Sequence, residues 1–253
     1  MKRKPAVIFL SGWALGPGAW FLQEKYFSAD RAIMVSYHSG VEEASRDGQG
    51  PSLYGLNALK AINRETEDPM VLTGWSLGSL VALELALLMP EKIKGLVLIG
   101  GTSRFTQAPD YHGGLPRVLV ERMKKSLTRN PGQTLEKFFS LMFTSQEREE
   151  GIMEQFQKGY LSPGQNWSEK ELAAGLDFLI NQDLREKLGK IKVPSLIIHG
   201  DRDEICPPAA ACYLHAQLKN AQLLMLPGCG HVPFLSKAEV FNEIVRRWLD
   251  DLH

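Results

Sequence analysis

Residues 70–90 read MVLTGWSLGSLVALELALLMP. The run Met70–Thr73 is short and apolar, as a buried strand is, and the Leu- and Ala-rich stretch Ser76–Met89 is typical of a helix. Between them, residues 74–78 read Gly-Trp-Ser-Leu-Gly, with a small residue two places before and two places after the serine. This G-x-S-x-G turn between a strand and a helix is the setting of a nucleophile elbow. We therefore expect Ser76 to be a catalytic nucleophile; the alternative is an ordinary serine helix cap.

Five further apolar runs have the length and composition of the strand before this turn. They are mostly apolar on both faces, as parallel strands are when helices cover both sides of a sheet. The runs are Ala6–Leu10, Ile33–Tyr37, Gly95–Ile99, Ser195–His199 and Gln222–Leu226. Helical stretches separate them, and the last of these, Lys237–Leu252, places its apolar residues on one stripe. The alternation predicts an α/β fold with a mostly parallel, doubly wound sheet of about six strands.

Residues 104–190 interrupt this alternation, because no convincing strand occurs there. Four helices are expected instead, with Pro-Gly loops at residues 131–132 and 163–164. The expected helices are Leu115–Leu127, Thr134–Phe143, Gln146–Tyr160 and Lys170–Leu179. An all-helical block between two strands of a sheet predicts an inserted lid. We call residues 104–190 the helical insertion, and we expect residues 1–103 and 191–253 to form the core.

The composition excludes several classes of protein. The 253 residues include 29 Lys and Arg against 29 Asp and Glu, and 44% are hydrophobic. These values are typical of a globular protein, and a nucleic-acid-binding protein would show a basic excess. No apolar run approaches the ~20 residues of a membrane-spanning helix. We expect a monomer that binds neither nucleic acid nor membrane.

The N-terminus and the cysteines bear on the compartment. Lys2-Arg3-Lys4 precedes an apolar run of only five residues, which is too short for the core of a signal peptide. Cys206, Cys212 and Cys229 are odd in number and lack CxxC spacing. They predict neither a disulfide framework nor a zinc site. A cytoplasmic location is the expectation from both observations.

A serine hydroxyl is a weak nucleophile unless a base takes its proton. Among the six histidines, His231 has the most suggestive setting, because it lies in the glycine-rich stretch Pro227–Phe234 between the last strand and the last helix. This places it at the carboxyl ends of the strands, where ligands of open α/β sheets bind. The alternative is a solvated loop histidine. His199 ends a strand within His-Gly-Asp, and we expect a structural role for it.

A carboxylate should orient the imidazole and stabilise its cation. The loop 199–207 supplies three acids after the penultimate strand, which satisfies the chain order Ser, Asp, His. Asp203 is preferred to Asp201, which directly follows the turn glycine and is suited to capping the loop locally. Spacing alone leaves the choice between the two open.

An oxyanion needs two backbone N–H donors. One is expected from Leu77, directly after the nucleophile, and the other from Trp13 in the loop after the first strand. Gly12 would let this loop approach Ser76; the alternative is a plain strand exit that contains a glycine. Because triad chemistry requires neither a metal nor an organic cofactor, none is expected.

Together these residues resemble the α/β-hydrolase superfamily over nearly the whole chain. Within it, the elbow followed by Leu80-Val81-Ala82, the pair Gly12-Trp13 and the stretch Gly230–Phe234 are similar to the carboxylesterases that cleave pimeloyl-[acyl-carrier protein] methyl ester in biotin synthesis. Two stretches of the helical insertion, Thr134–Phe138 and Gly175–Arg185, are also similar to them. This second likeness is the more specific one, because many esterases share the elbow.

The resemblance implies a serine esterase that works through an acyl-enzyme. It implies Ser76, Asp203 and His231 as the triad, and Trp75 as a residue that lines the acyl pocket. The sequence departs from the pattern at four places. Ser11 stands where the family usually has His, and Ser79 replaces a glycine after the elbow. Gln133 and Lys137 stand where the family has arginines that grip the carrier protein.

The helical insertion is locally basic. Residues 117–137 include six basic and two acidic residues, which gives this stretch a net charge of +4 in a neutral chain. The basic residues are Arg117, Arg122, Lys124, Lys125, Arg129 and Lys137. An acidic carrier protein would be steered by such a face; the alternative is a solvated helix surface. Phe138, Phe139 and Met142 are suited to line an acyl tunnel, or equally to pack the insertion onto the core.

Three functions are compatible with these features. The first is an esterase on a carrier-linked or free acyl ester, and the second is another lidded hydrolase, such as a lactonase, a thioesterase or a carbon–carbon bond hydrolase. The third is a non-catalytic ligand receptor on a hydrolase scaffold. The fold alone does not select among substrates, so comparing carrier-linked, lactone and thioester substrates is the decisive experiment.

Overall fold

The computed structural model describes residues 4–38, 40, 50–160 and 167–252. Their six strands form one sheet in which every neighbouring pair is parallel, with the order β2-β1-β3-β4-β5-β6. The strands are β1 (Ala6–Leu10), β2 (Ala32–Met34), β3 (Met70–Trp75), β4 (Ile93–Ile99), β5 (Ser195–Gly200) and β6 (Ala221–Leu226). The order reverses between β1 and β3, and such a switch point is where open α/β sheets bind ligands.

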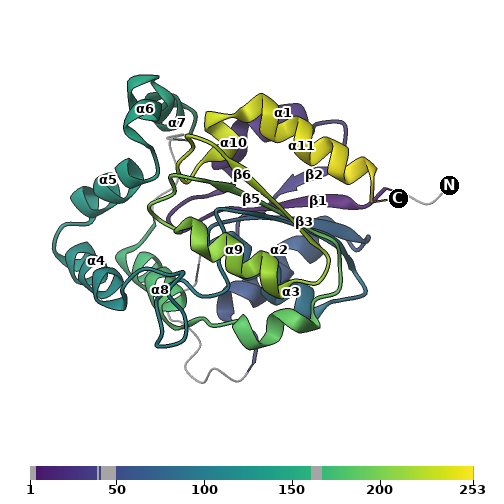
Figure 1. The fold of residues 1–253 in the computed structure, drawn as a ribbon, viewed down its shortest axis with the longest axis horizontal. Helices are drawn as coiled ribbons and strands as arrows, with labels where there is room; N and C mark the ends of the chain where they lie inside the picture. Colours follow the sequence, from purple (N-terminus) through teal and green to yellow (C-terminus); the bar gives the residue numbers. More distant parts are fainter. Residues whose placement is uncertain (1–3, 39, 41–49, 161–166, 253) are drawn as a thin grey trace.

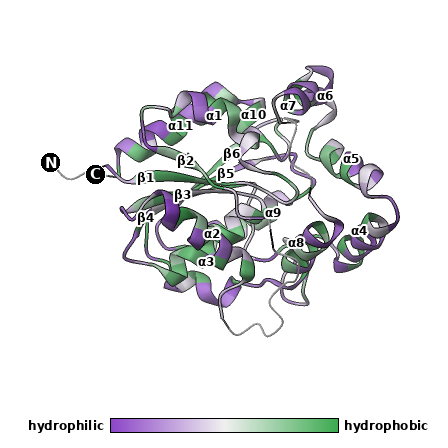
Figure 2. Cartoon of the chain, turned by 180° about the vertical axis from the view of Figure 1, so that it is seen from behind, coloured by the Kyte–Doolittle hydropathy of each residue, from purple (hydrophilic) through white to green (hydrophobic). Residues whose placement is uncertain are grey.

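Helices cover both faces of this sheet (Figure 1). On one face lie α1 (Phe21–Tyr26), α10 (Pro233–Ser236) and α11 (Ala238–Asp250), and on the other lie α2 (Leu53–Glu65), α3 (Leu77–Leu88) and α9 (Pro208–Gln217). Figure 2 shows the hydrophobic strands between the two layers of helices. The predicted α/β class with a doubly wound parallel sheet is therefore confirmed. None of the described helices has the length and apolar character needed to cross a membrane.

The two edge strands differ from the sequence prediction. The expected strand Ile33–Tyr37 is wrong in its bounds, because β2 ends at Met34 and pairs with β1 over only three positions. Tyr37 leaves the sheet and donates a hydrogen bond from its hydroxyl to the Ser11 carbonyl. At the other edge, β6 alternates between exposed and half-buried residues before the buried Leu226, rather than being apolar on both sides. An edge strand lacks one neighbour, so burial on both faces is not required there.

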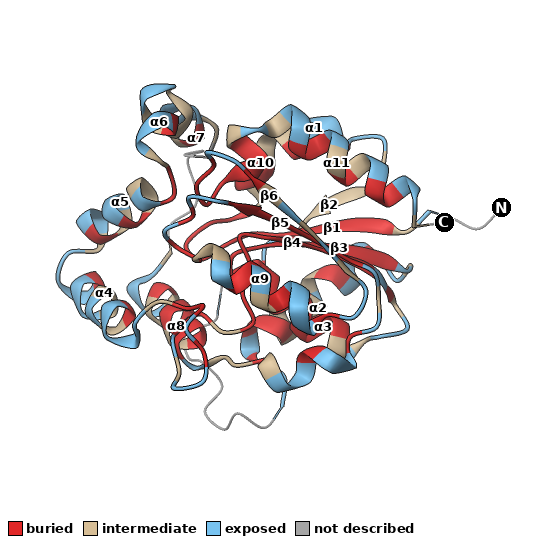
Figure 3. Ribbon diagram, viewed as in Figure 1, coloured by how far each residue is buried: buried red, intermediate tan, exposed pale blue. Residues whose placement is uncertain are grey.

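The central strands carry the core. Every residue of β1, β3 and β5 is buried, and so are the first ten residues of α3 (Figure 3). The carboxyl ends of these strands lie on the side of the sheet away from the chain termini (Figure 1). The turn between β3 and α3 is thus held by two buried elements.

The helical insertion follows β4 and precedes β5 along the chain. In space it lies at the same end of the sheet, beyond the carboxyl ends of the strands (Figures 1 and 2). Its described helices are α4 (Arg117–Arg129), α5 (Pro131–Leu141), α6 (Ser145–Glu149), α7 (Ile152–Tyr160) and α8 (Glu169–Asn181). The single helix predicted over Gln146–Tyr160 is wrong, because Gly151, with a φ of 75°, separates α6 from α7. A positive φ ends a right-handed helix, and glycine accepts it without strain. The predicted Pro163-Gly164 loop lies outside the described residues.

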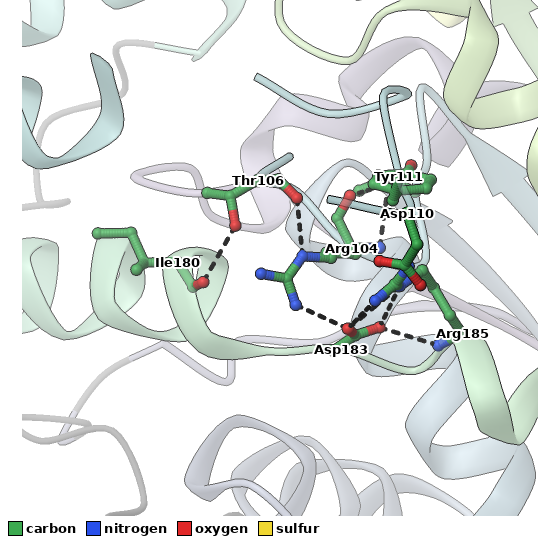
Figure 4. A network of polar contacts seen from close by, with 8 residues as sticks. Arg104, Thr106, Asp110, Tyr111, Ile180, Asp183 and Arg185 are labelled. Atoms are coloured by element: carbon green, nitrogen blue, oxygen red, sulfur yellow. Dashed lines mark hydrogen bonds and ion pairs between the residues drawn. The ribbon is translucent and has the colours of Figure 1, made fainter. Parts of the chain in front are cut away.

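A polar network ties together the two chain segments at the base of the insertion (Figure 4). The Asp183 carboxylate accepts hydrogen bonds from Arg104 at 2.6 Å and from Arg185 at 2.9 Å, and Arg185 also pairs with Asp110 at 2.9 Å. The Thr106 hydroxyl donates to the Ile180 carbonyl at 3.2 Å. The beginning and the end of the insertion are therefore joined side by side where they leave the core.

Candidate active site

Ser76 stands alone between β3 and α3 in a strained backbone conformation. Its φ is 57° and its ψ is −119°, which is unusual for a residue other than glycine and costs about 1–3 kcal/mol. The two glycines of the motif make the turn possible. A Cβ at Gly74 would lie 2.3 Å from the Gly78 carbonyl oxygen, and a Cβ at Gly78 would lie 2.2 Å from the Leu10 carbonyl oxygen. No other residue fits at these two places, which gives the G-x-S-x-G spacing a steric reason.

His231 is held from three directions. Its backbone N–H donates to the Met142 carbonyl at 2.7 Å, and its carbonyl accepts from Trp75 Nε1 at 2.8 Å. Its ring Nδ1 lies 2.7 Å from Asp203 Oδ2. The ring is buried, and Nε2 has no hydrogen-bond partner among the residues that the structure describes. Because Trp75 directly precedes Ser76, the histidine loop and the elbow are brought together.

The glycine after β4 makes room for this imidazole. Gly100 has a φ of 49°, and a Cβ there would lie 2.9 Å from His231 Nδ1 and 3.3 Å from Asp203 Oδ2. Sequence reasoning did not select Gly100, although a Gly-Gly pair directly after a buried strand is a visible signal. Any side chain at this position would push the ring away from its carboxylate partner.

The two aspartates of the loop after β5 have different surroundings. Asp203 is buried, and its Oδ1 accepts hydrogen bonds from the N–H groups of Ile205 and Cys206, both at 2.9 Å. Asp201 is exposed, and its Oδ1 accepts from the Gly228 N–H at 2.7 Å. Asp203 therefore faces the imidazole of His231, whereas Asp201 links its own loop to the loop after β6. This contact reaches a different loop, so it is not the capping within its own loop that was expected for Asp201.

His199 contributes a second imidazole beside Asp203. Its Nε2 lies 2.7 Å from the Cys206 carbonyl oxygen and 3.3 Å from Asp203 Oδ2. A carbonyl can only accept, so Nε2 carries the proton and donates. Burial lowers the pKa of His199, against the smaller opposite effect of Asp203. The ring is therefore neutral and holds the aspartate loop closed, in line with a structural role.

The loop after β1 approaches the elbow closely. A Cβ at Gly12 would lie 3.2 Å from Ser76 Cβ. Trp13 anchors this loop to the insertion, because its Nε1 donates to the Leu172 carbonyl of α8 at 2.8 Å. Ser11 bonds within the loop, from its hydroxyl to the Gly16 carbonyl at 2.8 Å. Leu77 is the first residue of α3, where an N–H has no partner within the helix.

A cavity of about 550 Å³ opens beside Ser76. Its walls are mainly apolar and come from α4, α5 and α8 of the insertion and from the aspartate loop; they include Phe138, Leu119 and Ile205. Three of the four residues that the sequence suggested for the acyl pocket are not among its lining residues. Phe139 packs near Phe156, the carbonyl of the buried Met142 accepts from the His231 N–H, and the Trp75 indole donates to the His231 carbonyl. Phe138 lines the cavity, whereas Trp75, Phe139 and Met142 do not; for Phe139 and Met142 this favours the alternative of packing the insertion onto the core.

The basic face of the insertion is smaller than the sequence suggested. Arg117 is paired with Glu121 at 2.8 Å, and Lys124 is paired with Asp177 at 2.5 Å. Within the described ranges, no ion pair is found for the remaining four, which are exposed: Arg122, Lys125, Arg129 and Lys137. Arg129 and Lys137 also line the cavity. Two cations therefore stand where the cavity meets the surface of the insertion.

Metal-ligating groups do not cluster in the part of the chain that the structure describes. No group of three or more His, Cys, Asp and Glu side chains there is arranged to hold a metal ion. Cys206 and Cys229 are buried free thiols, and Cys212 is an exposed one.

The fold and this arrangement of loops define a class of protein, and comparison with known proteins agrees. Residues 58–238 match the α/β hydrolase fold family. The chain is 32% identical over 243 residues to the pimeloyl-[acyl-carrier protein] methyl ester esterase of Nitrosomonas europaea, covering 94% of this chain and 92% of that one. It is also 32% identical over 252 residues to the enzyme of the same name from Aromatoleum aromaticum, covering 96% and 99%.

A solved structure supports the fold. An esterase from Exiguobacterium antarcticum superposes with a TM-score of 0.83 at 23% identity, covering 99% of this chain and 93% of that one. The chain belongs to the α/β hydrolase fold family. Within it, the chain is a carboxylic ester hydrolase.

Proposed function

We propose that this protein is a serine esterase that hydrolyses the methyl ester of pimeloyl-[acyl-carrier protein] in biotin synthesis. One observation carries the chemistry: the strained Ser76 borders an apolar cavity, and Trp75, the residue before it, is bonded to a buried histidine whose Nδ1 lies 2.7 Å from Asp203. The substrate rests on the two relatives of that name, which the chain matches over nearly the full length.

In the first half of the reaction, His231 Nε2 takes the proton of the Ser76 hydroxyl as its oxygen attacks the ester carbonyl. The negative oxygen of the tetrahedral intermediate accepts hydrogen bonds from the N–H groups of Trp13 and Leu77. The imidazolium then gives its proton to the methoxy oxygen, and methanol leaves an acyl-enzyme on Ser76. Asp203 keeps the proton of the imidazole on Nδ1 and stabilises the cation.

In the second half, His231 takes a proton from water, and the resulting hydroxide attacks the acyl carbonyl. The same N–H groups hold the second tetrahedral intermediate, and its collapse returns the proton to Ser76. The products are methanol and a free carboxylate on the acyl chain. The apolar walls of the cavity suit a methylene chain, since burying each CH₂ contributes about 0.8 kcal/mol.

The helical insertion acts as the lid in this proposal, over a core of residues 1–103 and 191–253. Its outer surface combines exposed cations with exposed apolar side chains. Leu119 and Leu141 are both 48% exposed, and both line the cavity along with Arg129 and Lys137. An acidic carrier protein would meet the cations, and its acyl chain would enter between the apolar side chains. The same cations would attract any anionic partner, and salt weakens such attraction. The dependence of kcat/KM on salt is therefore the informative measurement.

The test compares a carrier-linked methyl pimeloyl ester with a small chromogenic ester. Changing Arg122, Lys125 and Lys137 to Glu should lower kcat/KM for the carrier-linked ester by about tenfold or more and change that for the free ester little, because steering acts on encounter. Rising ionic strength should have the same selective effect on the unchanged protein.

A matched control carries the same change of charge at the amino ends of the strands, at the opposite end of the sheet from the site. Arg64, Lys94 and Lys219 are exposed and lie near the amino ends of β3, β4 and β6. Their reversal to Glu should leave both substrates within about twofold. Equal losses on both substrates, or hydrolysis of lactones or thioesters in preference to the methyl ester, would favour a free small-molecule substrate.

A further inference from the structure

Glu147 lies at the start of α6, in a capping box of the helical insertion. The Thr144 hydroxyl accepts the Glu147 N–H at 3.1 Å, and the Glu147 carboxylate accepts the Thr144 N–H at 2.7 Å. Such reciprocal bonds are a common way to begin a helix. Glu147 as a whole is, however, only 3% exposed. Burial of this degree is unusual for a carboxylate and implies a further partner.

The further partner is the loop that carries His231. The Gly230 N–H lies 3.1 Å from one oxygen of Glu147 and 3.2 Å from the other. The next N–H along the chain, that of His231, donates to the Met142 carbonyl at 2.7 Å. Two consecutive N–H groups of the histidine loop are therefore bonded to the insertion. A Cβ at Gly230 would lie 2.4 Å from the Met142 oxygen, so only glycine permits this approach.

The loop needs such support from outside. Gly228 has a φ of 74°, and two of the four residues 228–231 are glycines, which lose much conformational freedom when ordered. The core holds the imidazole and the carbonyl of His231, through Asp203 and Trp75. The insertion holds the N–H groups. Without Glu147, the buried Gly230 N–H would lose its acceptor, and the loop would be held less tightly in its position.

We propose that Glu147 is a positioning residue for the catalytic base: it acts through Gly230 to keep His231 in place, and so couples the tip of the insertion to the reaction. This inference rests on the role of His231 in the proposed function. It implies that the Met142 carbonyl and the Glu147 carboxylate belong to the support of the base rather than to a part of the lid that swings freely, because lifting them would release both N–H groups.

The test uses three variants of the full chain. Glu147→Leu removes the acceptor at nearly constant volume, and kcat for a small free ester should fall about 10- to 100-fold with little change in KM, as small misplacements of a reacting group do. Glu147→Gln should recover most of the activity, because one amide oxygen can still accept from Gly230. Thr144→Val is the matched control: it removes the hydroxyl of the same capping box but leaves the bond to Gly230, and kcat should stay within about twofold.

A second readout does not depend on activity. Amide hydrogen exchange of a peptide covering residues 226–234 should accelerate in Glu147→Leu but neither in Glu147→Gln nor in Thr144→Val. Unchanged kcat and exchange in Glu147→Leu, or equal losses in Thr144→Val, would overturn the inference. Should His231→Ala keep full activity while Glu147→Leu still accelerates exchange, the proposed function fails and the structural contact stands.

Discussion

The core and the helical insertion meet at the site, but they contribute to it in different ways. On the core side, the chain approaches Ser76 and His231 closely at glycines: a side chain would clash at residues 74, 78 and 100 and would be tight at residue 12. On the insertion side, single polar groups reach across, namely the carbonyls of Met142 and Leu172 and the carboxylate of Glu147. The comparison teaches that the core sets the geometry of the reacting groups, whereas the insertion shapes the cavity and steadies the loops around it.

The largest effect should come from the core side, at the elbow. Ser76→Ala removes the hydroxyl that forms the acyl-enzyme, so kcat should fall by several decades, as losses of triad members do. A fluorophosphonate should label the unchanged protein at Ser76 and leave the alanine variant unlabelled, as read by mass spectrometry of the digest. Retained turnover or labelling in the variant would remove Ser76 from the mechanism and break the division between the two regions.

A smaller effect separates two neighbouring aspartates of one core loop. Asp203→Asn disturbs the tautomer of His231, and kcat should fall about 10⁴-fold. Asp201→Asn is the matched control, because it removes the same charge from the same loop. The Asp201 carboxylate accepts from the Gly228 N–H rather than from the imidazole, so the loss of kcat should stay below about tenfold. Steady-state kinetics on a free ester decide this, and a greater loss in Asp201→Asn would reverse the assignment.

The smallest effect is expected at the base of the insertion, and it concerns stability. Burial alone would raise the pKa of Asp183, but the hydrogen bonds from Arg185 and Arg104 outweigh it and lower the pKa below its usual value of 3.8. A pKa that is lowered in the folded state stabilises the protein at every pH above the usual pKa of the group. This contribution is lost as the pH falls through the lower pKa of the folded state. The Tm of Asp183→Asn should therefore lie below that of the unchanged protein at neutral pH.

The pH series sharpens this last comparison. The gap in Tm between the two proteins should close as the pH is lowered from 7 towards 3, while kcat for a free ester at neutral pH stays within about twofold. Asp68→Asn is a control in the core, where the aspartate pairs with Arg31 at 2.7 Å. A gap that is the same at every pH would mean that the Asp183 charge contributes nothing to the attachment of the insertion.

Much of the fold was predictable from local sequence. The turn from β3 to α3 is one continuous segment, and its strand, glycines and helix all lie within twenty residues. The order of the other strands follows from apolar runs of strand length. The ends of these strands were predicted to within about two residues, except at the edge strand β2. Edge strands have fewer neighbours, so their sequence pattern is weaker and their ends are harder to predict.

The chain by itself determined the α/β class, the elbow and the glycine-rich loop of His231, because each is marked by a pattern of residues close in sequence. Only the tertiary structure decided which side chains meet across long separations. Lys124 pairs with Asp177, 53 residues away, so its charge is matched within the insertion. The Glu147 carboxylate accepts from the Gly230 N–H, 83 residues away. The same holds for Trp75, which supports His231 instead of lining the cavity. Such contacts depend on how helices pack over the ends of the strands, and local patterns of hydrophobicity carry no record of that packing.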